Sequence, residues 1–320
     1  MTEKIIKLDD KISQEDQMIL NMIDFSSPKG TEVIIRNKET GEELFKGHNK
    51  TVIAGSQFIA TKLWGIDNAV TLPTYNGELG IEDQTRSGSD NEPLICLFCV
   101  GISGCGSQSS QVYPVSYTNR IPGSSLVPFR YEKGTDLPDD LRSLYYGRKY
   151  IQKEQSQDDR YAYYFKAIES KQLHLQYVDG TEVTSTCYSD TSGIKAITFV
   201  EAALSVSKSD CRDIFSSGDF TPTLGDGTIS PPLTLADARI NTLSLCQGWY
   251  KTSASDGIKY FFQIQPVTQI NFSNISLVDA SVAIEVLYRT YYWYSYRYKV
   301  YFILRVPKKA LLDYFIIYIT

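Results

Sequence analysis

Histidine is scarce in this sequence, and the residue patterns of the common catalytic centres are missing with it. The two histidines, His48 and His174, are far apart in the chain, and no serine or cysteine has the surroundings of a known nucleophile motif. Cys96, Cys99 and Cys105 have no second pair at metal-ligand spacing, and on a strand the first two would point to opposite faces. We therefore predict no catalytic, metal-binding or cofactor-binding residues, and no enzymatic activity.

Paired carboxylates are the one catalytic arrangement that the sequence leaves open. Glycoside hydrolases use two carboxylates that are recognised by their separation in space, and the 37 acidic residues offer many pairs. The adjacent acids at Asp139–Asp140 and Asp158–Asp159 are more simply interpreted as solvated caps and turns.

A long apolar segment is also lacking, which argues against a secreted or membrane-spanning protein. The N-terminal MTEKIIKLDDKISQEDQ has charges where a signal peptide has its apolar core. The C-terminal LLDYFIIYIT is shorter than the roughly 20 residues of a membrane span and contains Asp313. We expect a protein made in the cytoplasm of its host, without a membrane partner, whose six cysteines are buried thiols rather than disulfides.

The sequence has fewer basic residues (32) than acidic residues (37). The net charge is −5 and the pI about 5.3, whereas a surface that wraps nucleic acid needs clustered Lys and Arg to neutralise phosphates. The glycine-rich GISGCGSQSS is followed neither by a helix nor by the Lys-Ser/Thr pair of a phosphate-binding loop. DNA is therefore expected only as a transient, non-specific contact.

Tyrosine is abundant instead, with 23 residues, and it is dense in the segment Ser281–Arg305. Nearly every second residue from Val282 to Leu304 is apolar or aromatic, while most charges lie on the other parity. A continuous strand of this length would extend about 80 Å, several times the usual strand length. Two interpretations remain open, an ordinary sandwich core with wet edges and an arm that contacts another subunit. The candidate interface residues all occupy the alternate positions that carry most of the charges. They are Arg289, Tyr291, Trp293 and Arg297.

The chain as a whole predicts a mainly β fold. We expect sandwich-like or barrel-like antiparallel sheets, one amphipathic helix at about 51–65, short peripheral helices and the long β arm. The predicted divisions are an N-terminal arm with a short helix (1–30), a β-rich body with the main helix (31–217), a loop (218–232), a β-rich continuation with the aromatic strand (233–306) and a C-terminal tail (307–320).

Local patterns predict individual elements. A hairpin is expected with its turn at Lys38–Gly41. Asn49 is predicted to cap the main helix, and Gly55 inside that helix indicates either the close approach of another backbone or simple tolerance. Residues 68–93 are predicted to form a long surface loop, and Leu94–Val100 a strand that is buried on both faces.

Further along the chain, Asp179-Gly180 predicts a second hairpin turn. A short polar helix is expected near SKSDCRDIF. Lys259–Pro266 and Ile270–Leu277 are predicted as separate strands.

Several phrases stand out together: GHNKTVIAGSQFIATKLWG, LFCVGISGCG with the following LVPFRY, ITFVEAAL and INTLSL. They contain a His-Asn-x-x-Val-x-x-Gly phrase that leads into a helix, and a strand ending in Val-Gly-x-x-Gly-x-Gly that leads into a wrapping loop. In these features, over roughly Glu32 to Leu287, the chain resembles virion structural proteins of tailed bacteriophages, including the crAss-like phages that infect gut Bacteroidetes. The resemblance implies a neck or tail-tube ring, or another structural part of the particle, without catalytic residues. The tyrosine-rich end departs from the pattern.

Taken beside the resemblance, the residues favour a homo-oligomeric ring or connector at the neck or tail of a virion, through which DNA passes. Its expected partners are copies of itself and neighbouring virion proteins such as the portal, other rings or tail proteins. The alternative is a glycan-binding or glycan-cleaving surface protein for host attachment. Clustered exposed aromatic side chains beside two carboxylates in a cleft would favour the alternative, and a ring of identical subunits would favour the first.

Overall fold

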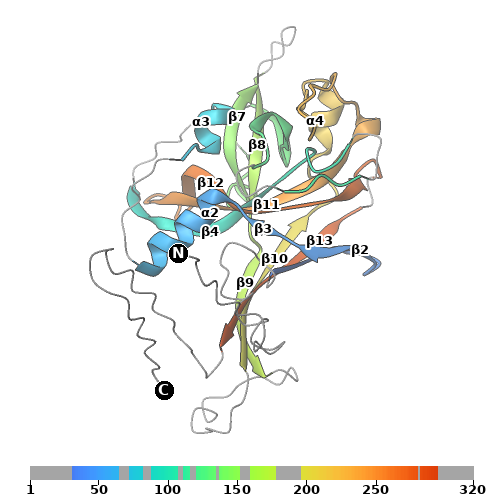
Figure 1. Ribbon diagram of the computed structural model, residues 1–320. Coiled ribbons are helices and arrows are strands. Elements are labelled where there is room, and N and C mark those ends of the chain that lie inside the picture. The colour runs from blue at the N-terminus through green and yellow to red at the C-terminus, as the bar shows by residue number, and fades with distance from the viewer. Residues whose placement is uncertain are drawn as a thin grey trace, which may run out of the picture. The chain divides into compact units, whose positions relative to one another are not determined.

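A computed structural model describes residues 31–64, 72–81, 88–106, 111–115, 120–134, 137–151, 159–177, 196–279 and 282–294. Within them the protein is mainly β, as predicted, with two sheets and few helices (Figure 1). The chain divides into two compact units. The larger comprises Met1–Gln172 and Glu201–Thr290, and the smaller comprises Leu173–Val200 and Tyr291–Thr320.

The first sheet has five strands in the order β2, β1, β13, β10 and β9. They are β1 (Thr31–Asn37), β2 (Glu43–His48), β9 (Ser170–Tyr177), β10 (Ala196–Val206) and β13 (Ile284–Tyr294). Antiparallel β1 and β2 form the predicted hairpin, and Gly41 supplies its turn with a φ of 71° that L residues rarely adopt. On its other side β1 pairs antiparallel with β13, so that Val33 lies opposite Tyr288. Residues of β9, β10 and β13 belong to both compact units.

The second sheet has the order β3, β12, β11, β4, β8 and β6, with β5 paired to β4 and β7 paired to β8. Its strands are β3 (Lys50–Thr51), β4 (Gly88–Gly101), β5 (Leu126–Val127), β6 (Arg130–Lys133), β7 (Tyr145–Ile151), β8 (Arg160–Ala167), β11 (Arg239–Ser253) and β12 (Lys259–Ser276). In the described part of the chain both sheets are open, with β2 and β9 at the ends of one and β3 and β6 at the ends of the other. This arrangement agrees with the sandwich-like form of the prediction.

The helices lie on the side of the second sheet. The predicted main helix is α2 (Ile53–Trp64); α3 (Tyr75–Leu79) and α4 (Arg212–Ser217) are short, and η2 (Gly123–Ser125) and η4 (Leu235–Asp237) are single turns. Both α2 and α3 pack against β12, whereas α4 packs against β6. The α4 helix confirms the helix expected near SKSDCRDIF, although Ile214 and Phe215 on it are buried.

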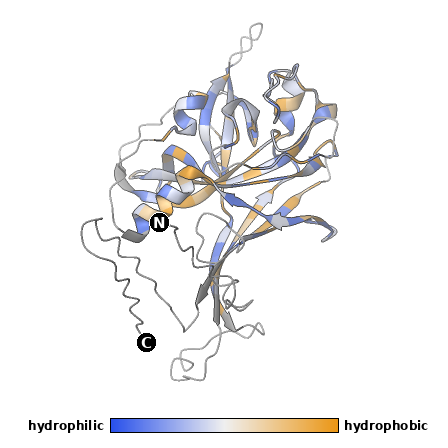
Figure 2. Cartoon of the chain, viewed as in Figure 1, coloured by the Kyte–Doolittle hydropathy of each residue, from blue (hydrophilic) through white to orange (hydrophobic). Residues whose placement is uncertain are grey.

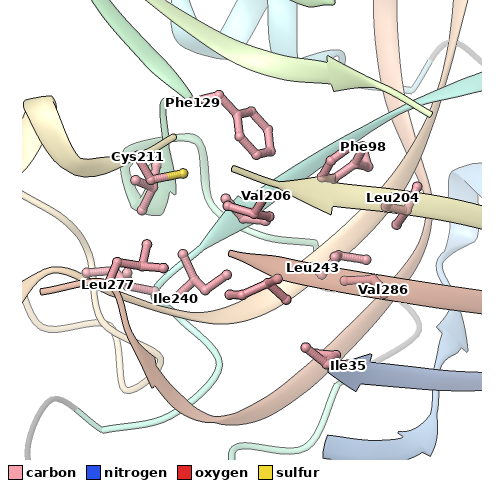
Figure 3. Close-up of a cluster of buried hydrophobic side chains, with 14 of the residues drawn as sticks. Ile35, Phe98, Phe129, Leu204, Val206, Cys211, Ile240, Leu243, Leu277 and Val286 are labelled. Atoms are coloured by element: carbon pink, nitrogen blue, oxygen red, sulfur yellow. The ribbon is translucent and has the colours of Figure 1, made fainter. Parts of the chain in front are cut away.

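The core of the larger unit lies between the two sheets. Figure 3 shows Ile35 and Val286 of the first sheet in one buried cluster with Phe98 and Leu243 of the second. A second cluster includes Leu97 on the opposite face of β4. Figure 2 shows the corresponding pattern, with hydrophobic and hydrophilic residues interspersed along the strands. The residues Leu97–Val100 are fully buried, so that this part of β4 is covered on both faces as predicted.

Several sequence predictions need correction. The predicted loop 68–93 contains α3 and the first residues of β4, and Leu94 is 38% exposed, so two-sided burial is limited to the second half of the predicted strand. The two strands predicted between 259 and 277 are one strand, β12, because shifts of register at three points along β11 and β12 let it continue through Pro266.

Some predicted segments form no described helix or strand, and others lie outside the described residues. The predicted loop 218–232 lies between α4 and η4, and strands on both sides of it belong to the same two sheets. The N-terminal arm, the Asp179-Gly180 turn, residues 295–306 of the aromatic segment and the C-terminal tail lie outside the described residues.

Candidate functional site

Strand β13 contains three of the four predicted interface residues. Arg289 is described in full. For Tyr291 and Trp293 only the backbone is described, and Arg297 lies outside the described residues. The structure therefore brings the first three onto one strand, at alternate positions.

The alternation predicted for this segment is confirmed where side chains are described. Ile284, Val286 and Tyr288 are each 1% exposed and point into the core, whereas Glu285 and Arg289 are partly exposed. Burial raises the pKa of the Tyr288 hydroxyl, which stays protonated at neutral pH. One parity of β13 thus closes the sandwich, and the other lies on the outer face of the five-stranded sheet.

Charged side chains cross that outer face from strand to strand. The Arg289 Nε lies 2.7 Å from an oxygen of Glu201 on β10, and Arg289 Nη1 lies 3.6 Å from Glu32 on β1. The other Glu32 oxygen lies 2.7 Å from Nζ of Lys46 on β2. Burial opposes ionisation of Glu32, but the hydrogen bond and charge of Lys46 and the charge of Arg289 lower its pKa overall.

This series of ion pairs was not predicted from the sequence, because it joins residues of four strands. The alternating pattern of the strand around Glu201 marks that glutamate as a surface position, but it does not name Arg289 as its partner. The guanidinium of Arg289 is thus already engaged within its own sheet, and an intermolecular contact at this residue would have to share it with Glu32 and Glu201.

The His-Asn-x-x-Val-x-x-Gly phrase is explained by packing. His48 Nδ1 lies 2.7 Å from the Thr31 carbonyl oxygen, and the buried Asn49 donates from Nδ2 to the hydroxyl of Tyr288. Asn49 is therefore not the helix cap that we predicted, because two residues of β3 and one further residue separate it from the start of α2. Its amide instead ties the entry of the helix to β13, across the core.

Gly55 marks a close approach between two backbones. A Cβ atom at this position would lie 2.0 Å from the carbonyl oxygen of Val267 on β12. The Val52 N–H donates to the same oxygen at 3.0 Å. Of the two explanations offered by the sequence, close approach is confirmed, and Ala54 and Gly55 let α2 lie directly against the edge of the second sheet.

The glycines at the end of β4 and just after it also allow close packing of the backbone. A Cβ at Gly101 would lie 2.8 Å from the Ser125 carbonyl oxygen, and a Cβ at Gly104 would lie 2.1 Å from that of Asn241. The Gly104 N–H donates to Oδ1 of Asn241 at 2.7 Å, and Asn241 Nδ2 donates to Oδ1 of Asn274 at 2.9 Å. These contacts fold the segment onto β11 and β12.

The described cysteines are free thiols. Cys99 and Cys246 on adjacent strands are buried with their sulfurs 3.6 Å apart, and burial raises the pKa of Cys99. Burial also raises the pKa of Cys96 to about 12. Within the described ranges no three His, Cys, Asp or Glu side chains are grouped as metal ligands.

A buried ion pair is the main polar feature that sequence reasoning missed. Lys166 Nζ on β8 lies 2.7 Å from Oδ2 of Asp210, and these side chains are 8% and 0% exposed. The Tyr145 hydroxyl donates to the other oxygen at 2.7 Å, and the Ser207 N–H donates to Oδ2 at 2.7 Å. The next residue, Cys211, has a φ of 67°. The pair thus fixes the tight connection between β10 and α4, and nothing in the local sequence pattern signals it.

Comparison with protein-family models, with curated protein sequences and with solved structures gives no match for this chain. None of the helices in the described ranges has the length and apolar character that crossing a bilayer requires.

Proposed function

We propose that the protein is a structural component of a phage virion, which assembles with copies of itself into a ring or connector at the neck or tail, through which DNA passes. The observation that supports this proposal most is that the two faces of β13 have different surroundings. Val286 and Tyr288 are buried and close the sandwich, whereas Arg289 lies on the outer face of the five-stranded sheet. In the sequence, Tyr291 and Trp293 continue the alternate positions that begin with Arg289.

The surroundings of β13 are consistent with an interaction surface. The described helices α2 and α3 pack against β12 and α4 packs against β6, both strands of the other sheet. Tyrosine, tryptophan and arginine are the residues that contribute most often to the binding energy of interfaces. A second copy of the chain is the partner that such a surface would meet in a ring.

Catalytic chemistry is not needed to explain the sequence phrases that suggested a virion protein. The contacts of His48, Asn49, Gly55, Gly101 and Gly104 are all structural. The net charge of −5 suits a wall that DNA passes without adhering, because phosphates are repelled by a surface of the same sign.

The test is electron microscopy of the purified full-length protein. We expect closed rings of identical subunits with a central opening. Open chains, disordered aggregates or single particles of monomer size would contradict the proposal.

A further inference from the structure

The loop between α4 and η4 exposes apolar side chains although its backbone is held in place. Ile229 is 76% exposed, and Leu235 in η4, which packs against α4, is 36% exposed. A backbone hydrogen bond closes the loop, from the Ser230 N–H to the Pro222 carbonyl oxygen at 2.9 Å. The exposure of Ile229 is therefore a property of a loop with a fixed backbone.

Buried contacts anchor this loop to the rest of the larger unit. Phe220 and Leu233 belong to the core cluster between the sheets, and each is 6% exposed. A Cβ at Gly225 would lie 2.5 Å from the Ser103 carbonyl oxygen, so the loop backbone lies directly against the segment after β4. Apolar side chains that such contacts hold at the surface offer area that a partner can bury at little cost in conformational entropy.

The charges within this segment are all negative. From residue 213 to residue 238 the chain has four acidic residues and no basic one. Arg239 lies 3.7 Å from Asp237 and partly neutralises it, whereas Asp213 and Asp226 are exposed. Hydrogen bonds from Thr228 lower the pKa of Asp226, which is therefore ionised at neutral pH. We call four exposed side chains of this segment the loop surface; they are Asp213, Asp226, Ile229 and Leu235.

The C-terminal part of the same chain has the opposite charge. From Tyr288 to Thr320 the sequence has six basic residues and one acidic residue, a net charge of +5, whereas the whole chain has a net charge of −5. The residues before Tyr288 therefore have a net charge of −10. Five of the six basic residues lie in the segment Arg297–Lys309, among tyrosine and aliphatic residues, and this segment is outside the described residues. Its sequence is both basic and apolar, and it complements the loop surface in both respects.

We propose that the loop surface binds the segment Arg297–Lys309 of a second copy of the chain. This inference rests on the proposed function, and it names the surface that each subunit offers to its neighbour. The contact joins two different surfaces head to tail, as a closed ring of more than two subunits requires. Opposite charges select the partner, and the apolar side chains supply the buried area. DNA phosphates would also attract the basic segment, but the loop surface would repel them.

Reversing the charges on each side of the contact in turn tests the proposal. The loop variant is Asp213→Lys/Asp226→Lys, and the segment variant is Arg297→Glu/Lys299→Glu. We expect each variant alone to self-associate more weakly than the parent, by about tenfold or more in light scattering at low salt. An equimolar mixture of the two variants should recover much of the association, because each segment then meets a loop surface of opposite charge on the other variant.

Two further variants keep the result specific. Asp139→Lys/Asp140→Lys makes the same change in total charge as the loop variant, at two exposed acids outside the loop surface, and should associate as the parent does. Ile229→Ala removes an exposed side chain without changing any charge and should weaken association. A melting curve for each variant shows that the protein compared is folded.

The possible failures are distinguishable. A parent that stays monomeric would overturn both the ring and this inference. If the parent is oligomeric but the folded Ile229→Ala protein or the loop variant associates as tightly, the inference is wrong and the ring stands. The same holds if mixing the two charge-reversed variants gives no gain, or if the segment variant loses affinity for DNA while its self-association is unchanged.

Discussion

Gly55 is the residue at which the addition of one methyl group should have the clearest effect. Alanine is favoured over glycine within a helix by about 1 kcal/mol. Here, however, the new Cβ would meet the Val267 carbonyl oxygen at 2.0 Å, and a backbone atom cannot move aside as a side-chain end can. We expect Gly55→Ala to lower the free energy of unfolding by about 1–3 kcal/mol, the usual cost of overpacking.

The matched control is Gly77→Ala in α3. A Cβ at Gly77 would meet only the Thr74 hydroxyl oxygen, at an ordinary 3.6 Å. This substitution should leave stability unchanged or raise it slightly. Urea unfolding of both variants measures the difference, and a stable Gly55→Ala protein would show that α2 does not lie against β12 as described.

Asp210 tests the buried ion pair. Replacing it with asparagine keeps its shape but leaves the ammonium of Lys166 without a counter-charge in the interior. Removing one member of a buried pair costs about 3–5 kcal/mol, so Asp210→Asn should unfold at clearly lower denaturant concentration. The double variant Asp210→Asn/Lys166→Met removes both charges and should recover part of the loss.

The exposed pair of Lys208 and Glu39 provides the comparison. These side chains are 48% and 50% exposed, and exposed pairs contribute about 0–1 kcal/mol. Lys208→Met should therefore shift stability much less than Asp210→Asn. Equal effects of the two substitutions would mean that Asp210 is hydrated rather than buried.

Single residues differ in how far the sequence reveals them. Gly55 could be recognised because glycine in a helical pattern is unfavourable, although its partner Val267 could not be named. Asn49 was assigned to a helix cap because it precedes the pattern, but its actual partner Tyr288 is 239 positions away along the chain. Asp210 gave no signal, since its contact with Lys166 depends on how the connection between β10 and α4 packs against β8.

At the scale of elements, period-two patterns were the most informative. The strand β13 was recognised from its alternation, and the hairpin of β1 and β2 from its turn residues. The pairing of β1 with β13 could not be deduced, because it joins the two ends of the described chain. The helix α3 was missed because its five residues are too few to show a helical period.

Strand β13 also carries the prediction about assembly. Trp293→Ala and Arg297→Ala should each weaken self-association, by roughly thirtyfold for a loss of about 2 kcal/mol at a true interface hot spot. Thermal melting should change less than association does. Light scattering over a dilution series, beside a melting curve for each variant, separates the two effects.

Arg289→Ala tests the predicted interface residue whose contacts within the sheet are described. Its side chain is 31% exposed and already pairs with Glu201 and Glu32, so its removal should cost at most about 1 kcal/mol of folding stability. If Trp293→Ala or Arg297→Ala lowers the melting temperature sharply while the folded protein still assembles normally, these residues belong to the core and the interface prediction is wrong.

At the scale of the whole molecule, the sequence predicted a mainly β chain and the structure confirms it. The arrangement of the thirteen described strands into two sheets could not be predicted from the sequence, because it depends on contacts between distant segments. The central functional claim is that several copies of the chain assemble into a ring. Its support is the outer face of the five-stranded sheet and the acidic composition of the chain.

Native mass spectrometry of the purified full-length protein tests that claim most directly. At micromolar concentration we predict one predominant closed oligomer with a fixed number of subunits, which shifts toward monomer in Trp293→Ala. A single species of 36.1 kDa at every concentration tested, unchanged by the substitution, would contradict the proposed ring.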